Sequence, residues 1–590
     1  MRNRPRRWLS LGLSLVCLFS SVLAVRGDES FSDWETRQFK ETLQEDFMSL
    51  HFSVKDPSKF GISVNKVTMG DRPSRQTYEK GMEKNKKALQ ELTQFDVNSL
   101  SENEKIDYEI LKDYLEASSK DGFYDFDFHF LPQTGLISNL VTNFSEFKIS
   151  NLEEAKQYLE LVKSVPEFID GALEVTKDQA SRGFFMTDKA VEKTVSQIDK
   201  FVEKTEDNSL ILSFQDRLKK ANLESSDLIQ KNKDVILNQF IPSYLKVKET
   251  LVNLKGSRKG ESLYQMEGGL AYYQSLLASQ TSTKGLPKEV FDLADHILDK
   301  ELKALVSVAT RHKESELSET MEEKKPEEIL EQHRLNLENF LPSPAKVSYE
   351  VDYLDSSVAN DGVVAYYLNP PIDDLENNVI RINRDAVSDT NEMYSTLAHE
   401  GYPGHLYQMT WFLNTNPHPV RSILGHLGYA EGWAMYVEDA MWKYSSLNEA
   451  AKEYNRSLTN INYILSALVD IGVNGMGWSL ADIKTYVNNK GLDGEAAKSL
   501  YEVVTQDPGA YLPYGIGLAQ FLRMKDEALS KNPSMDLKDL NKVFLNHGDR
   551  PFWMVQRDLD QILSSDKKEV FSMQKVVEDI LHFLSSWLKA

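Results

Sequence analysis

Apolar and polar residues alternate along most of the chain with the period of an amphipathic helix. From about residue 29 to residue 310, segments such as 152–162 and 291–308 repeat apolar residues at three- and four-residue spacing. The same spacing resumes at Asn391 and is broken at three points, near Gly491, Pro508 and Gly548. The pattern therefore predicts a mainly α protein.

Between residues 345 and 385 the pattern changes to short runs rich in β-branched and aromatic residues. The runs are separated by Asp361-Gly362 and by Pro370-Pro371, which favour turns. They predict a small β-sheet, with strands at residues 347–351, 362–366 and 379–383.

The length of 590 residues exceeds what a single small core requires, so at least two packed helical lobes are expected. The charged stretch 312–333 predicts a solvated helix or linker. We expect a signal peptide at 1–24, an N-terminal helical lobe at 25–311 and a C-terminal lobe at 312–590. The C-terminal lobe would contain the sheet at 345–385 and two helices at 391–413 and 426–444.

The first 24 residues have the organisation of a secretory signal. Four arginines within residues 2–7 precede the apolar run 8–24, and a small residue, Ala24, ends a cleavage motif. An uncleaved membrane anchor is the alternative, and a lipid anchor on Cys17 is disfavoured because Val16 precedes it. We expect an exported protein that is secreted, periplasmic or on the cell surface, without stable membrane insertion after signal cleavage.

The net charge and the single cysteine restrict the partners and metal ligands that the protein can have. The formal charge of -22 argues against nucleic acid as a partner, because phosphate backbones require clustered Lys and Arg. Cys17 is the only cysteine and lies in the predicted signal, so the mature protein has no disulfide and no thiolate ligand. Any metal site must therefore be built from His, Asp and Glu.

The segment His399-Glu400-Gly401-Tyr402-Pro403-Gly404-His405 holds two of only 11 histidines, beside a carboxylate. Six residues advance a regular helix by about 600°, which turns the second imidazole roughly 120° away from the first. A straight helix cannot bring both to one metal ion. The glycines and the proline allow two alternatives: two residues bulge out and restore convergence, or the helix ends at Gly401 and the histidines are unrelated.

A second predicted helix supplies further carboxylates. Glu431 lies between Ala430, Gly432 and Trp433, whose sizes favour close packing, and a Glu on such a helix completes two-His, one-Glu zinc sites. Glu438 is two turns further along the same side, where its carboxylate could orient a ligand histidine.

These segments together resemble the bacterial domain-of-unknown-function 885 family, which belongs with the helical gluzincin metallopeptidases. The resemblance extends over nearly the whole mature chain, including segments near Tyr272-Tyr273, Asn383, Pro508-Gly509 and Gly548. Two residues depart from the family pattern, Leu406 and Ala510, where the family commonly has His and Gln.

The resemblance implies a gluzincin-like fold of two lobes around a cleft, with zinc on His399, His405 and Glu431 and with Glu400 as general base. Zinc would lower the pKa of a water toward about 7, and Glu400 would carry its proton to the leaving amine. Tyr514, on a Gly-rich turn just before a helix, is the candidate donor to the developing oxyanion, with Tyr511 as the competing candidate.

The substrate predicted in this way is a short peptide. In gluzincins a strand lies along the cleft, and here the edge of 379–383 could pair with an extended peptide. Arg381 or Arg523 could bind a C-terminal carboxylate. Two other functions stay open: hydrolysis of a non-peptide amide such as an N-acyl amino acid, and peptide binding without catalysis.

Overall fold

A computed structural model describes residues 29–564, apart from residues 121, 344–346 and 355–362. The predicted signal peptide and Cys17 lie outside the described residues. Among the helices that are described, none is long and apolar enough to cross a membrane.

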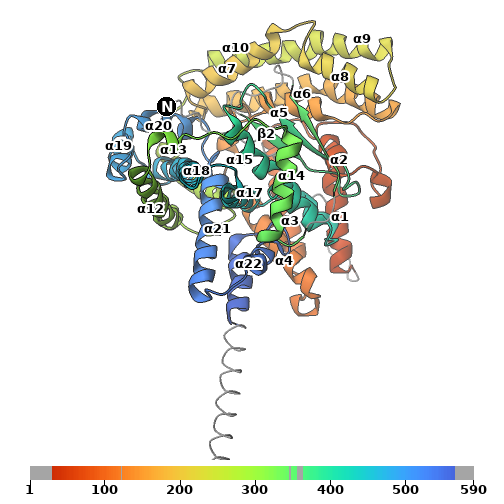
Figure 1. Ribbon diagram of the computed structural model, residues 1–590. Coiled ribbons are helices and arrows are strands. Elements are labelled where there is room, and N and C mark those ends of the chain that lie inside the picture. Colours follow the sequence, from red (N-terminus) through yellow and green to blue (C-terminus); the bar gives the residue numbers. More distant parts are fainter. Residues whose placement is uncertain (1–28, 121, 344–346, 355–362, 565–590) are drawn as a thin grey trace, which may run out of the picture.

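In the part of the chain up to Arg311, the α-helices follow one another without an intervening strand among the described residues (Figure 1). They are α1 (Phe31–Glu45), α2 (Phe47–Ser53), α3 (Arg75–Leu92), α4 (Glu102–Ser118), α5 (Leu136–Glu146), α6 (Leu152–Arg182), α7 (Asp188–Glu203), α8 (Ser209–Lys220), α9 (Ser226–Val235), α10 (Ile241–Asn253), α11 (Gly269–Thr281) and α12 (Pro287–Arg311).

The second half contains three strands among further helices. The elements are α13 (Glu314–Leu317), α14 (Pro326–Asn336), β1 (Tyr349–Tyr353), β2 (Ala365–Leu368), β3 (Asn378–Ile382), α15 (Thr390–Glu400), α16 (His405–Leu413), α17 (Leu427–Met441), α18 (Glu449–Asp470), α19 (Leu480–Asn489), α20 (Ala496–Gln506), α21 (Leu512–Lys531) and α22 (Leu537–Leu545). The prediction of a mainly helical protein with one small sheet is confirmed.

Local sequence explains where many of these helices begin and end. Ser30, Ser101 and Asn151 cap α1, α4 and α6, each accepting a hydrogen bond from a backbone N–H of the first turn. The longest helix, α6, ends at Gly183, whose φ of 95° is in the left-handed region that glycine adopts without strain.

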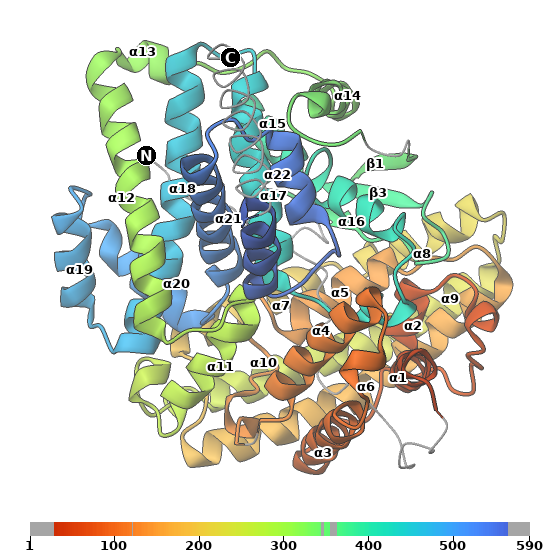
Figure 2. The ribbon, with the colours of Figure 1, turned by 90° about the horizontal axis from the view of Figure 1, so that it is seen from below.

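Buried side chains form two clusters. The first comes mainly from α1 to α10, and the second from α11 onward together with Phe126, Leu263 and Met266. Figure 2 shows most red-to-yellow helices in its lower half and most green-to-blue helices in its upper half. Helices α11 and α12 contribute to the second cluster although both lie within residues 25–311. The predicted boundary between the lobes at residue 311 stays a prediction.

The sheet has the order β1-β3-β2, with β1 parallel and β2 antiparallel to β3. Residues 379–383 were expected to offer an edge to a peptide, and this expectation is wrong. Strand β3 has a partner on each side, so its backbone groups are already paired.

The charged stretch 312–333 differs from its prediction at its end. His333, on α14, is fully buried, and its Nε2 lies 3.0 Å from the carbonyl oxygen of Tyr394. Burial lowers the pKa of His333 to about 4, which keeps the ring neutral. The end of this stretch thus belongs to the core that supports α15.

The backbones of α17 and α21 approach each other closely at two glycines. A Cβ added to Gly432 would lie 2.6 Å from the Cα of Gly517. This close approach fixes the separation between the helix that carries Glu431 and the helix that carries Tyr514.

We predict that Gly432→Ala lowers the free energy of unfolding by about 1–3 kcal/mol, because α17 and α21 must separate. The measurement is the shift of the thermal unfolding midpoint. Gly425→Ala is the matched control, since a Cβ there meets nothing within 4 Å. Equal midpoints for the two variants would contradict the packing argument.

Candidate metal centre

The two histidines of the predicted motif lie on either side of an interruption between α15 and α16. The N–H of Gly404 donates to the carbonyl of Ala398 at 2.9 Å, and that of Tyr407 to Gly401 at 3.4 Å. Each of these hydrogen bonds joins residues six apart in sequence, whereas the hydrogen bonds of a regular α-helix join residues four apart. The chain therefore accommodates two extra residues between the histidines: α15 ends at Glu400, and α16 begins at His405 in a position that lets the rings converge.

Surrounding atoms crowd the two glycines of this interruption. A Cβ on Gly404 would collide with the carbonyl oxygen of His399, and one on Gly401 would collide with Leu330 of α14. Trp433 of α17 donates its Nε1–H to the carbonyl of Pro403 at 3.1 Å. The loop is thus attached to the helix that carries Glu431.

His399, His405 and Glu431 come together as a group that could hold a metal ion. Glu431 Oε2 lies 3.3 Å from His399 Nε2 and 3.5 Å from His405 Nε2. The two rings are nearly perpendicular, with centroids 4.9 Å apart. His399 and Glu431 are buried, whereas 16% of the His405 side chain is exposed, so the group opens to solvent on the His405 side.

The group is electrostatically coupled. Burial alone would raise the pKa of Glu431, but the charge of His405 and hydrogen bonding with both rings outweigh it and lower the pKa to about 2. Burial acts on His399 in the opposite direction and is outweighed by Glu431 and Glu438, so the pKa of His399 is raised. Glu431 is therefore held as a carboxylate beside two imidazoles.

Glu438 approaches His399 from the side opposite Glu431. Its Oε2 lies 3.5 Å from His399 Nδ1, and the carboxylate is almost fully buried. Both nitrogens of His399 thus face a carboxylate of α17, which fixes the plane of the ring.

Glu400, the last residue of α15, is buried beside the group without belonging to it. Its Oε2 accepts a hydrogen bond from the backbone N–H of Tyr367, on β2, at 2.8 Å. Burial raises the pKa of Glu400 to about 8, with Glu431 adding to the effect and with His405 and the Tyr367 N–H opposing it.

Tyr514 reaches the same region from α21. Its ring centroid lies 6.4 Å from that of His399, and the ring is buried. Burial and the charge of Glu431 raise its pKa well above the usual value, so the phenol keeps its proton. Tyr514 lies in the first turn of α21 rather than before the helix, and Tyr511 is the residue that caps that turn.

The two arginines proposed for a substrate carboxylate have partners within the protein. Arg381 binds Glu146 through Nε and Nη2, at 2.9 and 3.0 Å, and Asp352 through Nη1 at 3.2 Å. Arg523 donates to side chains of α21 and of residue 556, namely Gln520, Glu527 and Gln556. The structure therefore argues against a substrate-binding role for either one.

Sequence reasoning missed two groups near the centre. The Tyr367 N–H is a backbone group and has no sequence signature. Asp549 lies next to Gly548, in a segment that the sequence analysis used only for the family resemblance. It is close enough to His405 and Glu431 for their charges to act on its pKa. Burial raises the pKa of Asp549 to about 6, opposed by the positive charges of Arg421 and His405.

Solved structures similar to this one show the fold alone. A candidate lipoprotein from Colwellia psychrerythraea matches with a TM-score of 0.76 and 14% identity, covering 91% of this chain and 99% of that one. A candidate lipoprotein of unknown function from Shewanella oneidensis matches with a TM-score of 0.57 and 17% identity, covering 91% and 100%. No curated protein is similar enough to count as a match.

One sequence family spans most of the chain. The family described as "Bacterial protein of unknown function (DUF885)" matches residues 58–559, a range that includes every residue of the candidate metal centre. The chain belongs to this DUF885 family.

Proposed function

We propose that this protein is an exported zinc-dependent hydrolase that cleaves peptide bonds in short peptides, with a gluzincin-like site. The observation that carries the proposal is the convergence of His399, His405 and Glu431, with Glu400 buried next to them. Two imidazoles and one carboxylate, with no thiolate, are a donor set that zinc hydrolases use.

The distances from Glu431 to the two ring nitrogens fit a tetrahedral zinc ion. Two ligands that each lie about 2.0–2.1 Å from a tetrahedral ion are about 3.3–3.4 Å apart. The distances from Glu431 Oε2 to the two ring nitrogens, 3.3 and 3.5 Å, match this spacing. The other oxygen of Glu431 is buried without a hydrogen-bond partner among the described residues, a state that a cation would relieve.

Each side chain has a distinct proposed role. A zinc ion at this site would supply a Lewis acid that polarises the scissile carbonyl and lowers the pKa of a water. Glu438 orients the His399 ring through Nδ1. The raised pKa of Glu400 would be lowered beside a bound cation, and the ionised carboxylate would accept the proton of the attacking water and transfer it to the leaving amine. Tyr514, which keeps its proton, donates to the oxyanion, and Tyr511 is the alternative donor.

The same chemistry would cleave a non-peptide amide, such as an N-acyl amino acid. The preference for peptides rests on the gluzincin resemblance, because β3 offers no edge and residues 365–367 of β2 are buried. A catalytically inactive peptide-binding protein is the other alternative. The buried Glu400 beside the ligand group argues against it, because binding alone gives no reason to keep a costly buried acid there.

Export is supported by the similar solved proteins, both described as candidate lipoproteins. The predicted signal at residues 1–24 is consistent with export. Because both similar proteins are described as lipoproteins, a lipid anchor on Cys17 is the alternative to a cleaved signal.

We predict about one zinc ion per chain in the purified protein. His399→Ala and His405→Ala should each abolish stoichiometric zinc, because two donors do not hold it tightly. Elemental analysis after dialysis is the measurement, and His296→Ala, at an exposed position of α12, is the control that should retain zinc. Full occupancy in both ligand variants would exclude this site.

We predict that Glu400→Gln keeps zinc and substrate affinity, while hydrolysis falls roughly a hundred-fold or more, because Gln cannot accept the proton. Turnover of a mixed short-peptide library and of N-acyl amino acids, with and without chelator, is the measurement. Glu431→Gln should instead lose zinc first, and Glu322→Gln, at an exposed loop position, should behave as wild type.

Two results would change the proposal. A wild-type rate in Glu400→Gln would remove Glu400 as general base. A zinc-loaded wild type that binds peptides and cleaves none of these substrates would establish the binding function instead.

A further inference from the structure

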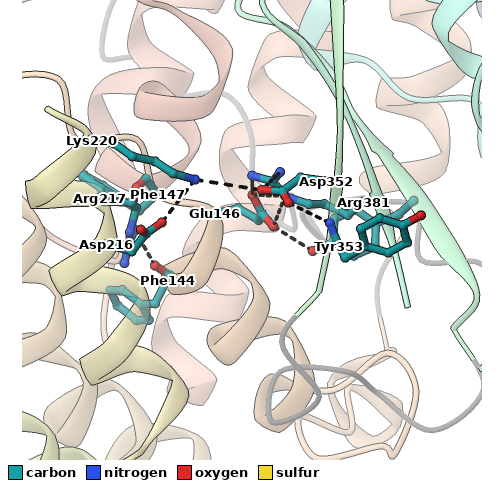
Figure 3. Close-up of polar contacts among 10 residues, drawn as sticks. Phe144, Glu146, Phe147, Asp216, Arg217, Lys220, Asp352, Tyr353 and Arg381 are labelled. Carbon is teal, nitrogen blue, oxygen red and sulfur yellow. Dashed lines mark hydrogen bonds and ion pairs between the residues drawn. The ribbon is translucent and has the colours of Figure 1, made fainter. Parts of the chain in front are cut away.

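A polar cluster joins the small sheet to the end of α5, and Figure 3 shows Glu146 beside Arg381 and Asp352. Arg381 of β3 is the direct partner of Asp352 on β1 and of Tyr366 on β2. Directly paired residues point to the same face of a sheet, so these three side chains lie side by side. Glu146, the last residue of α5, meets them there.

Glu146 binds two strands at once. Its Oε1 accepts from the Tyr366 hydroxyl at 2.9 Å and from Arg381 Nε at 2.9 Å, and its Oε2 accepts from Arg381 Nη2 at 3.0 Å. The Glu146 side chain is 6% exposed and that of Arg381 is 20% exposed, so water competes little for these bonds. Asp352, in contrast, is 42% exposed, and it contacts Arg381 and Lys220 from β1, which β3 separates from β2.

The next residue of β2 holds the proposed general base. Tyr367 follows Tyr366, and its N–H donates to Glu400 Oε2. Strand β2 has only four residues and pairs with β3 on one side. Glu146 and Glu400 therefore hold adjacent residues of a short edge strand, and a shift of Tyr366 moves the N–H that orients Glu400.

The other end of α5 is attached next to the proposed oxyanion donors. Just before α5, the backbone N–H of Gln133 and the hydroxyl of Thr134 donate to Asp507, at 2.9 and 3.1 Å. Asp507 directly precedes the Pro508-Gly509 turn that leads into Tyr511 and α21. Both ends of α5 are thus tied to segments that carry site residues.

We propose that Glu146 is a positioning residue of this site: by holding Tyr366, it fixes β2 so that the Tyr367 N–H fixes the carboxylate of Glu400. The contrasting role is a buried ion pair that only stabilises the fold. The effect on turnover rests on the proposed function, whereas the effect on the Tyr367 N–H does not.

The first experiment measures the Tyr367 hydrogen bond itself. Glu146→Gln removes the charge that binds Arg381 and weakens the hydrogen bond from Tyr366, and Tyr366→Phe removes that hydrogen bond. Asp352→Asn is the matched control, because it removes a carboxylate from the same arginine and leaves β2 untouched. Hydrogen exchange of a peptide that contains Tyr367, well below the unfolding midpoint, should speed up roughly tenfold in the two test variants and stay unchanged in the control.

The second experiment measures catalysis in zinc-loaded protein. The kcat of Glu146→Gln and Tyr366→Phe should fall roughly tenfold, with KM within twofold of wild type and with full zinc content, and Asp352→Asn should match wild type. In a Glu400→Gln background, Glu146→Gln should add no further loss, because both act through one group. If Glu146 has a purely structural role, Glu146→Gln should lower kcat by the same factor in the Glu400→Gln background as in the wild type.

The outcomes separate the two proposals. Unchanged exchange at Tyr367 in both test variants overturns the positioning role, and so does a full additional rate loss in the Glu400→Gln background. Faster exchange at Tyr367 in a protein whose wild type hydrolyses nothing supports the positioning link and rejects the proposed function.

Discussion

The candidate metal centre depends on the two extra residues between α15 and α16. A regular helix would direct the rings of His399 and His405 about 120° apart, and no single carboxylate could then meet both. The six-residue hydrogen bonds across Gly401 and Gly404 remove that offset, so both Nε2 atoms reach Glu431. Since Leu330 and Trp433 pack against the same interruption, the surrounding core is built around it.

The charges at this centre explain why its supporting helices must be placed so closely. Glu400, Glu431 and Glu438 are all buried, and together with two imidazoles they form a cluster that is expensive to desolvate. Each carboxylate has a specific partner: Glu431 has both rings, Glu438 has His399 Nδ1, and Glu400 has a backbone N–H. The close contact of Gly432 with Gly517 holds α17 at the separation that these pairings require.

Much of this could be predicted from local sequence, and the rest could not, for a physical reason. The periodicity of apolar residues predicted the helices and the three strands, because these signals are local. Strand β1 begins two residues later than expected, and β2 begins three residues later. The histidine spacing left open whether the two rings converge, and the family resemblance implied the group of His399, His405 and Glu431, which the structure brings together. Strand order, the burial of His333 and the Glu146–Arg381 pair, 235 residues apart, arise from tertiary packing, which leaves no local pattern. Arg381 looked free only because its partner is so distant in sequence.

The position of Glu400 shows how distant parts of the chain combine at one atom. Helix α15 fixes where its backbone ends, but a terminal side chain on a helix has several rotamers available. The Tyr367 N–H selects one of them, and Tyr367 is held in place by a strand that borders the sheet on one side only. Strand β2 is paired on one side, and in the positioning role proposed for Glu146 the hydrogen bond from Tyr366 to the end of α5 is its second attachment. The orientation of a carboxylate in the second half of the chain is therefore set in part by a helix of the first half.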